Sequence, residues 1–160
     1  MQKLVFLLVT VSILFQCQER TLSGKVVKVA DGDTFTILTN QNQQIRVRLH
    51  GIDAPEKSQD FSLASKKYLT DLVLHKTVDL YTKTKDQYGR VIAIANVDHL
   101  NVNEELLKAG LAWHFKEHDK NPAWHEMELA ARQSKIGIWS YPDPVPPWQF
   151  RKEKRLLRQR

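Results

Sequence analysis

Residues 46–56, with the sequence RVRLHGIDAPE, combine phosphate-binding and proton-accepting side chains in one short stretch. A guanidinium group matches a pair of phosphate oxygens, and a carboxylate either binds a hard cation or accepts a proton. Arg48 is followed within a few residues by Asp53 and Glu56. This combination predicts a site that processes phosphate groups. The alternative is a solvated strand edge with a surface salt bridge, because exposed Arg–Asp pairs are common.

The position of these side chains follows from the pattern around them. Apolar positions 45, 47 and 49 alternate with the basic positions 46, 48 and 50, which is the two-residue period of a strand. Gly51 and Pro55 then interrupt the strand. We therefore expect Asp53 and Glu56 to lie on a turn at the end of the strand that carries Arg48.

A second informative stretch, KTKDQYGR, spans residues 83–90. Tyr88 and Gly89 predict a turn that leaves Arg90 at the start of a strand. An arginine held in this way is a fixed phosphate ligand, whereas a mobile one loses rotamer entropy at each binding event. A charged hairpin tip without a ligand is the alternative.

Composition favours one globular domain with an anionic partner. The chain has 160 residues, 42% of them hydrophobic and 26% charged, which is ordinary for a packed domain. Its net charge is +6 and its isoelectric point is about 9.5, so nucleic acid or an anionic surface is the expected partner. The sequence has no internal repeat and no Walker-type or GxGxxG loop.

The first 17 residues are typical of a signal peptide. A short positive segment precedes an apolar run at residues 4–15 of about a dozen residues, which is short for a membrane span. We expect an exported protein, secreted or periplasmic, with an uncleaved membrane anchor as the alternative. Cys17, the only cysteine, excludes an internal disulfide. Its place suggests a lipoprotein anchor, although the preceding Leu14, Phe15 and Gln16 are not the small residues that such processing favours.

Residues 21–140 are expected to form a β-rich domain with helices, of the α+β class. Runs rich in β-branched residues predict five strands, at residues 24–30, 34–39, 44–50, 76–82 and 90–97. The first two are joined by a hairpin-type turn, which alone would explain Asp33. Apolar periodicity predicts a helix over residues 58–74, and Asn101 and Asn121 begin two more that end at Gly110 and Gly137. These elements suggest a small β-barrel with helices packed on it.

The last 20 residues, 141–160, differ from the rest. Residues 141–148 contain four prolines and are expected to be extended across the domain. Residues 151–160, RKEKRLLRQR, are strongly basic and could follow a nucleic-acid backbone or bind an anionic membrane surface. A solvated, disordered tail is the remaining alternative.

Histidines and aromatic residues near residue 114 allow two further interpretations. His114 and His118 have the spacing of metal ligands on a helix, and His125 follows. They have no acidic or cysteine partner at matching spacing, so surface or internally satisfied histidines are favoured. Trp113 and Phe115 flank His114 and could stack on a base, with core packing as the alternative.

Three motifs resemble the staphylococcal nuclease family in their order and approximate spacing. They are Asp31-Gly32-Asp33-Thr34, then Arg48 with Asp53-Ala54-Pro55-Glu56, and then Asp86-Gln87-Tyr88-Gly89-Arg90. Each motif is weak alone, but the ordered set is specific, and the resemblance covers about residues 22–139. It implies a five-stranded OB-fold barrel with about three helices. It also implies calcium-dependent cleavage of DNA and RNA on the 5′ side of the phosphodiester, which leaves 3′-phosphates.

The same resemblance assigns roles to individual residues. Asp33 and Asp53 look like calcium-binding carboxylates, and Ala54 like a ligand through its carbonyl. Glu56 resembles the general base, and Arg48 and Arg90 resemble the arginines that hold the phosphate. Tyr88, with Trp113 and Phe115, is expected to contact the nucleotide, and we expect a monomer. The rival hypothesis is a non-catalytic nucleic-acid-binding module on the same barrel, although such a module need not keep all five charged residues.

Overall fold

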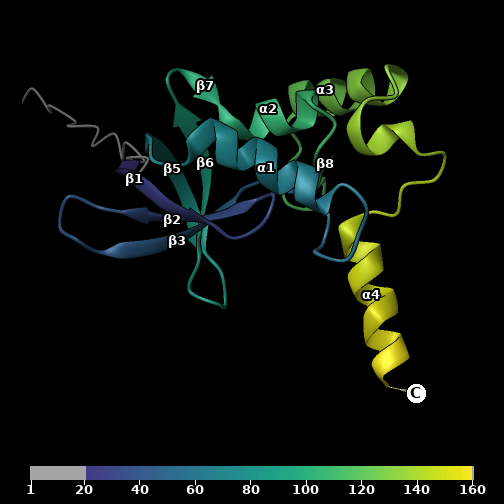
Figure 1. Cartoon of the computed structure of the whole chain (residues 1–160), viewed down its shortest axis with the longest axis horizontal. Coiled ribbons are helices and arrows are strands. Elements are labelled where there is room, and N and C mark those ends of the chain that lie inside the picture. The colour runs from purple at the N-terminus through teal and green to yellow at the C-terminus, as the bar shows by residue number, and fades with distance from the viewer. Residues whose placement is uncertain (1–20, 160) are drawn as a thin grey trace, which may run out of the picture.

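The computed structural model describes residues 21–159, so the expected signal peptide and Cys17 lie outside the described residues. Within that range the chain forms a β-barrel, helices that cover one side of it, and a separate C-terminal helix (Figure 1). The predicted α+β class with an OB-fold barrel is confirmed.

Five strands form the barrel. They are β1 (Thr21–Val29), β2 (Thr34–Leu38), β3 (Gln44–Leu49), β5 (Thr77–Lys85) and β6 (Val91–Val97). Neighbours pair antiparallel in the order β3-β2-β1-β5-β6, and a parallel pairing of β3 with β6 closes the barrel. Alternate side chains point inward, so Phe35, Val47, Leu49 and Leu80 are buried in one apolar core. The five predicted strands and the β1–β3 meander are confirmed.

The body of the protein has three helices, α1 (Ser62–Val73), α2 (Val102–Lys108) and α3 (Pro122–Gln133). Helices α1 and α2 pack on the barrel strands, and α3 packs on α2. The Asn101 side chain caps α2 by accepting hydrogen bonds from the amides of Asn103 and Glu104. The Asn121 side chain caps α3 by accepting one from the amide of Ala123. Both predicted helix starts are confirmed. A short 3-10 helix, η1 (Gly137–Ser140), follows α3.

Helix α1 differs from its prediction. It begins at Ser62 rather than residue 58, because Phe61 adopts a left-handed conformation with φ of 63° and its ring packs edge-on against Tyr141. Its buried residues are Ser65, Leu69 and Val73.

A two-stranded sheet outside the barrel places the turn after β3 beside residues that come much later in the sequence. Strand β4 (Ile52–Asp53) pairs antiparallel with β8 (Trp113–His114), so Asp53 lies beside Trp113. Gly51 makes this possible: its φ is 66°, and a Cβ there would lie 2.6 Å from the Cβ of Asp119. Neither strand was predicted, since each has only two residues. A further short strand, β7 (Leu100–Asn101), extends the sheet beyond β6.

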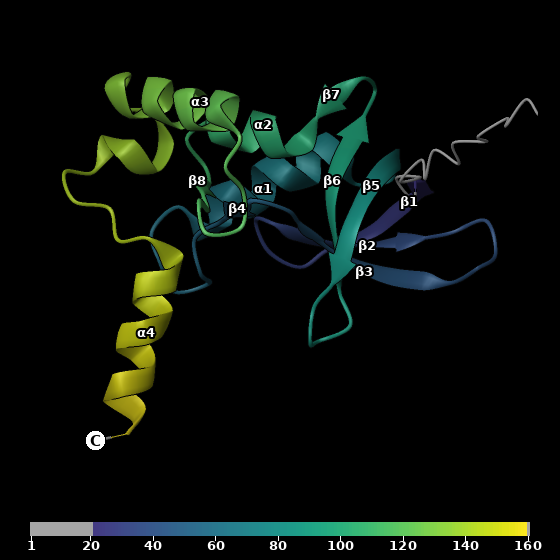
Figure 2. The same ribbon diagram turned by 180° about the vertical axis from the view of Figure 1, so that it is seen from behind.

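The C-terminal segment forms a helix, α4 (Pro147–Arg158), which the sequence did not predict. The extended conformation expected for residues 141–148 therefore ends at Pro146, and most of the basic segment is helical. Helix α4 projects from the body of the protein on the side to which the tip between β5 and β6 also points (Figures 1 and 2). No helix in residues 21–159 is long and apolar enough to span a membrane.

Candidate active site

A cleft of about 1090 Å³ lies between the barrel and α4. The turn after β3 and the loop before β2 line it, together with the β5–β6 tip and the inner side of α4. Figure 2 shows the β5–β6 tip and α4 on the same side of the molecule. Of the predicted site residues, the cleft is lined by Asp33, Arg48, Ala54, Glu56, Tyr88, Arg90 and Phe115.

Arg48 lies between two buried aspartates at the base of this cleft. One amino group forms an ion pair with Asp33, and the other donates to Asp53 over 2.6 Å. Asp33 is 3% exposed and Asp53 is 1% exposed. The pair is therefore not the solvated surface salt bridge of the alternative interpretation, because both carboxylates are buried and share the Arg48 guanidinium.

Strand pairing explains why Asp33 and Arg48 meet. Thr34 of β2 pairs with Arg48 of β3, and the Leu49 amide donates to the Asp33 carbonyl over 2.9 Å. The Ala54 amide donates to the second carboxylate oxygen of Asp33 over 2.8 Å. Burial alone would raise the pKa of Asp33, but the charge of Arg48 and the hydrogen bond from the Ala54 amide hold it below its usual value. Asp33 is thus a charged site residue rather than only a turn residue.

Arg90 is fixed at the opposite wall of the cleft, as its place after the Tyr88-Gly89 turn predicts. Its Nε donates to the Asp86 carboxylate over 2.7 Å, and Asp86 also accepts from the Tyr88 and Arg90 amides. The guanidinium lies 5.7 Å from the centroid of the Tyr88 ring, whose residue is 72% exposed. This arrangement orients Arg90 while leaving the Tyr88 ring accessible from the cleft.

Glu56 is joined to Asp53 through a residue that the sequence did not single out. Arg151 of α4 donates to Glu56 over 2.7 Å and to the two oxygens of Asp53 over 3.2 and 2.8 Å. Burial alone would lower the pKa of Arg151, but its bonds to these carboxylates raise the pKa above its usual value. Glu56, the expected general base, and Asp53, an expected cation ligand, are therefore adjacent.

The donors at this position suit a hard cation. Three carboxylates, those of Asp33, Asp53 and Glu56, bond to the Arg48 and Arg151 guanidinium groups, and Asp31 lines the same cleft. Loss of solvation on burial, together with the charge of Asp33, raises the pKa of Asp31 to about 6. Oxygen donors with excess negative charge are what Ca²⁺ requires. Within residues 21–159 no three His, Cys, Asp or Glu side chains form a cation site by themselves, so carbonyl and water ligands would be needed.

The two aromatic residues that flank His114 lie in different places: Trp113 is in the core and Phe115 lines the cleft. Trp113 is 4% exposed and packs edge-on against Trp139, so its ring is in the core and the stacking role expected for it does not fit this position. Phe115 lines the cleft and is stacked against Trp148 of α4, with ring centroids 5.1 Å apart. Trp148 was not singled out from the sequence.

The side chains of His114 and His50 both contact the Asp119 carboxylate. His114 is buried, and its Nε2 lies 3.1 Å from Asp119, while Nε2 of His50 lies 3.3 Å from the same carboxylate. The bond of His114 to Asp119 agrees with the interpretation of an internally satisfied histidine. Burial is the main cause that lowers the pKa of His50, against the opposing charge of Asp119.

Comparison with known proteins agrees with this geometry. Residues 46–141 match the family described as staphylococcal nuclease homologue. The chain belongs to this family. The matched region includes Arg48, Glu56 and Arg90.

Three relatives that match over most of their own length have names that describe nucleases. An uncharacterized endonuclease of Haemophilus influenzae is 40% identical over 153 residues, which cover 96% of this chain and 86% of that protein. A micrococcal nuclease of Shigella flexneri is 34% identical over 140 residues, covering 81% of this chain and 80% of that protein. An uncharacterized endonuclease of Escherichia coli is 40% identical over 134 residues, covering 83% and 87%. The protein is thus a nuclease of the staphylococcal type.

Proposed function

We propose that the protein is an exported, calcium-dependent nuclease that hydrolyses DNA and RNA with low sequence specificity and releases 3′-phosphate products. The observation that carries this proposal is the cluster of Arg48, Asp33 and Asp53 next to Glu56, in a cleft whose opposite wall holds Arg90. The cluster combines binding of a phosphate, binding of a cation and acceptance of a proton.

Arg48 and Arg90 would stabilise the charge that grows on the phosphate oxygens. Both guanidinium groups are held by carboxylates, so they do not reorganise when the phosphate arrives. Arg48 keeps its positive charge because its two aspartate partners raise its pKa against the effect of burial. Removal of one such group commonly costs about 10²–10³ in rate.

The residues that would hold the cation are Asp33 and Asp53, with the Ala54 carbonyl. When bound, Ca²⁺ supplies positive charge to the phosphate and to the attacking water. Asp33 is oriented for this by the Ala54 amide and by the Thr34 hydroxyl, which donates over 3.0 Å. The carboxylate positions are therefore set by the fold before any ligand arrives.

Glu56 would accept the proton of the attacking water. The water oxygen bonds to phosphorus, the bond from phosphorus to the 5′-oxygen breaks, and the 5′-oxygen leaves as a hydroxyl after protonation. The phosphate remains on the 3′-oxygen. The Glu56 backbone is held by a hydrogen bond from its amide to the Gln59 side chain over 2.9 Å, which limits its movement.

Low specificity follows from the kind of contact. The charged groups of the cleft recognise phosphate, which is the same at every nucleotide. Export is proposed on the basis of residues 1–17 alone, with lipid anchoring at Cys17 left open. We also propose that the protein acts as a monomer.

Metal removal tests the proposal. We expect the full chain to cleave labelled single-stranded DNA in Ca²⁺ and to lose this activity when a chelator is added. Asp53→Asn should raise the calcium concentration for half-maximal activity by at least about tenfold, the loss that removal of a supporting group alone can cause. The exposed Asp79→Asn is the matched control and should behave like the unsubstituted chain. Circular dichroism would check that both variants fold.

Two outcomes would contradict this. Cleavage that persists in chelator would exclude the metal requirement. Salt-sensitive DNA binding without cleavage, in the unsubstituted chain with Ca²⁺, would instead support the non-catalytic binding module.

A further inference from the structure

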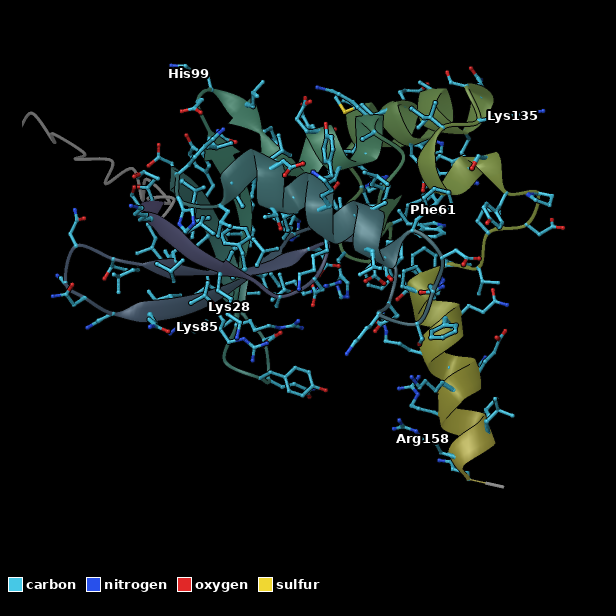
Figure 3. The ribbon with its side chains drawn as sticks, viewed as in Figure 1. Lys28, Phe61, Lys85, His99, Lys135 and Arg158 are labelled. Carbon is cyan, nitrogen blue, oxygen red and sulfur yellow. The ribbon has the colours of Figure 1, made fainter. Side chains whose placement is uncertain are left out.

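Helix α4 has the charge of a nucleic-acid-binding element. It carries five basic side chains and a single acidic one, Glu153. The basic residues are Arg151, Lys152, Lys154, Arg155 and Arg158. Figure 3 shows nitrogen-tipped side chains along the side of α4 that faces the barrel, with Arg158 at the free end of the helix. The charge is therefore directed toward the cleft and not only into solvent.

Arg151 fixes the orientation of this helix. Its guanidinium binds Asp53 and Glu56 with three hydrogen bonds, which join α4 to the turn after β3. A second link is made by Gln59, whose side chain donates to the Val145 carbonyl over 2.8 Å. Because of these contacts, the side of α4 that carries Arg151 forms one wall of the cleft.

Arg155 lies one turn beyond Arg151 on the same side, since residues four apart are neighbours on a helix. It lines the cleft and is exposed. Among residues 21–159 no carboxylate pairs with it; its charge is not neutralised within the described protein. A free guanidinium that faces a phosphate-binding cleft is suited to bind a second phosphate of the same strand.

Trp148 adds an aromatic surface to the same wall. Its ring is stacked on Phe115 at an interplanar angle of 13°, and both residues line the cleft. Trp148 is only partly buried. A base that enters the cleft can extend this stack, and stacking on aromatic rings does not depend on base identity.

We propose that α4 is a substrate-binding wall, in which Arg155 binds a phosphate next to the scissile one and Trp148 stacks on a neighbouring base. Arg151 anchors the wall at the site. The identity of the ligand rests on the proposed function, but the role of the wall in binding does not depend on cleavage.

The test measures binding without cleavage. Fluorescence anisotropy of a labelled single-stranded oligodeoxynucleotide would be recorded in chelator, with the full chain, across a range of salt concentrations. Arg155→Gln should weaken binding by about fivefold and reduce the slope of log affinity against log salt by about 0.7, as loss of one phosphate contact predicts. The matched control is Lys152→Gln, which removes the same charge from an exposed position of α4 that does not line the cleft.

A second pair of variants tests the aromatic surface. Trp148→Leu should weaken binding by at least about fivefold, whereas Trp148→Phe should keep most of the affinity, because a ring remains available. Circular dichroism would show whether α4 is retained. Retention of a folded helix together with loss of binding would assign the effect to the ring.

The outcomes separate the two proposals. The proposal that α4 binds substrate would be wrong if Arg155→Gln and Lys152→Gln had equal effects and Trp148→Leu bound like the unsubstituted chain. It would also be wrong if the unsubstituted chain did not bind the oligodeoxynucleotide. If the unsubstituted chain binds but never cleaves in Ca²⁺, and the variants behave as expected, the wall is supported and the nuclease proposal fails. In a cleaving enzyme, Arg155→Gln should raise KM with little change in kcat.

Discussion

Glu56→Gln is expected to lower the rate of DNA cleavage by about 10²–10⁴-fold, the usual contribution of a general base. The amide has nearly the same shape as the carboxylate but does not accept a proton from water. The side chain is 38% exposed, so the exchange should leave the fold intact. The measurement is the initial rate on single-stranded DNA at saturating Ca²⁺, together with a calcium titration.

The control for this variant is Glu117→Gln, which changes an exposed glutamate after β8 that does not line the cleft. It should cleave at the native rate. A rate for Glu56→Gln within about threefold of native, at saturating calcium, would remove Glu56 from the role of general base.

Arg48→Met should destabilise the protein by about 3–5 kcal/mol, in addition to its effect on cleavage. The variant keeps a long side chain but removes the cation that pairs with the buried Asp33, while Asp53 keeps its bonds to Arg151. Two like charges in a buried position are much more costly than a lost surface pair. Urea unfolding of the metal-free protein would measure the loss, because a bound cation would compensate part of it.

Arg46→Met is the matched control, since Arg46 lies on the same strand but is exposed. Its free energy of unfolding should stay within about 0.5 kcal/mol of native. If the two variants lost similar stability, the buried Arg48 cluster would not be the structural support of the site that we describe.

Local patterns were sufficient to predict most of the barrel and part of the site. The alternation in β3 and the turn between β1 and β2 place Arg48 and Asp33 at neighbouring strand ends, and the observed pairing joins them. The turn at Tyr88 and Gly89 likewise places Arg90, because its capping carboxylate, Asp86, is close in sequence. Such predictions succeed where the partners are near in the chain or on paired strands.

The parts that were missed depend on long-range contacts. Arg151 meets Asp53 and Glu56 from almost a hundred positions away, which no local pattern reports. The proline-rich segment was taken as extended as far as Trp148. Pro147 is in fact the first residue of α4, a position that suits proline, and that signal was present in the sequence. The sequence left core and cleft both open for Trp113, because an aromatic residue next to a site has the same local pattern in either position.

The central claim, attack of water on phosphorus with departure of the 5′-oxygen, is tested most directly by cleavage of single-stranded DNA in ¹⁸O-water with Ca²⁺. DNA has no 2′-hydroxyl, so water is the attacking group that the account requires. Mass spectrometry of the products should find one ¹⁸O atom for each cleavage, in a phosphate at the 3′ end. Absence of cleavage, or label in a 5′-phosphate, would contradict the account.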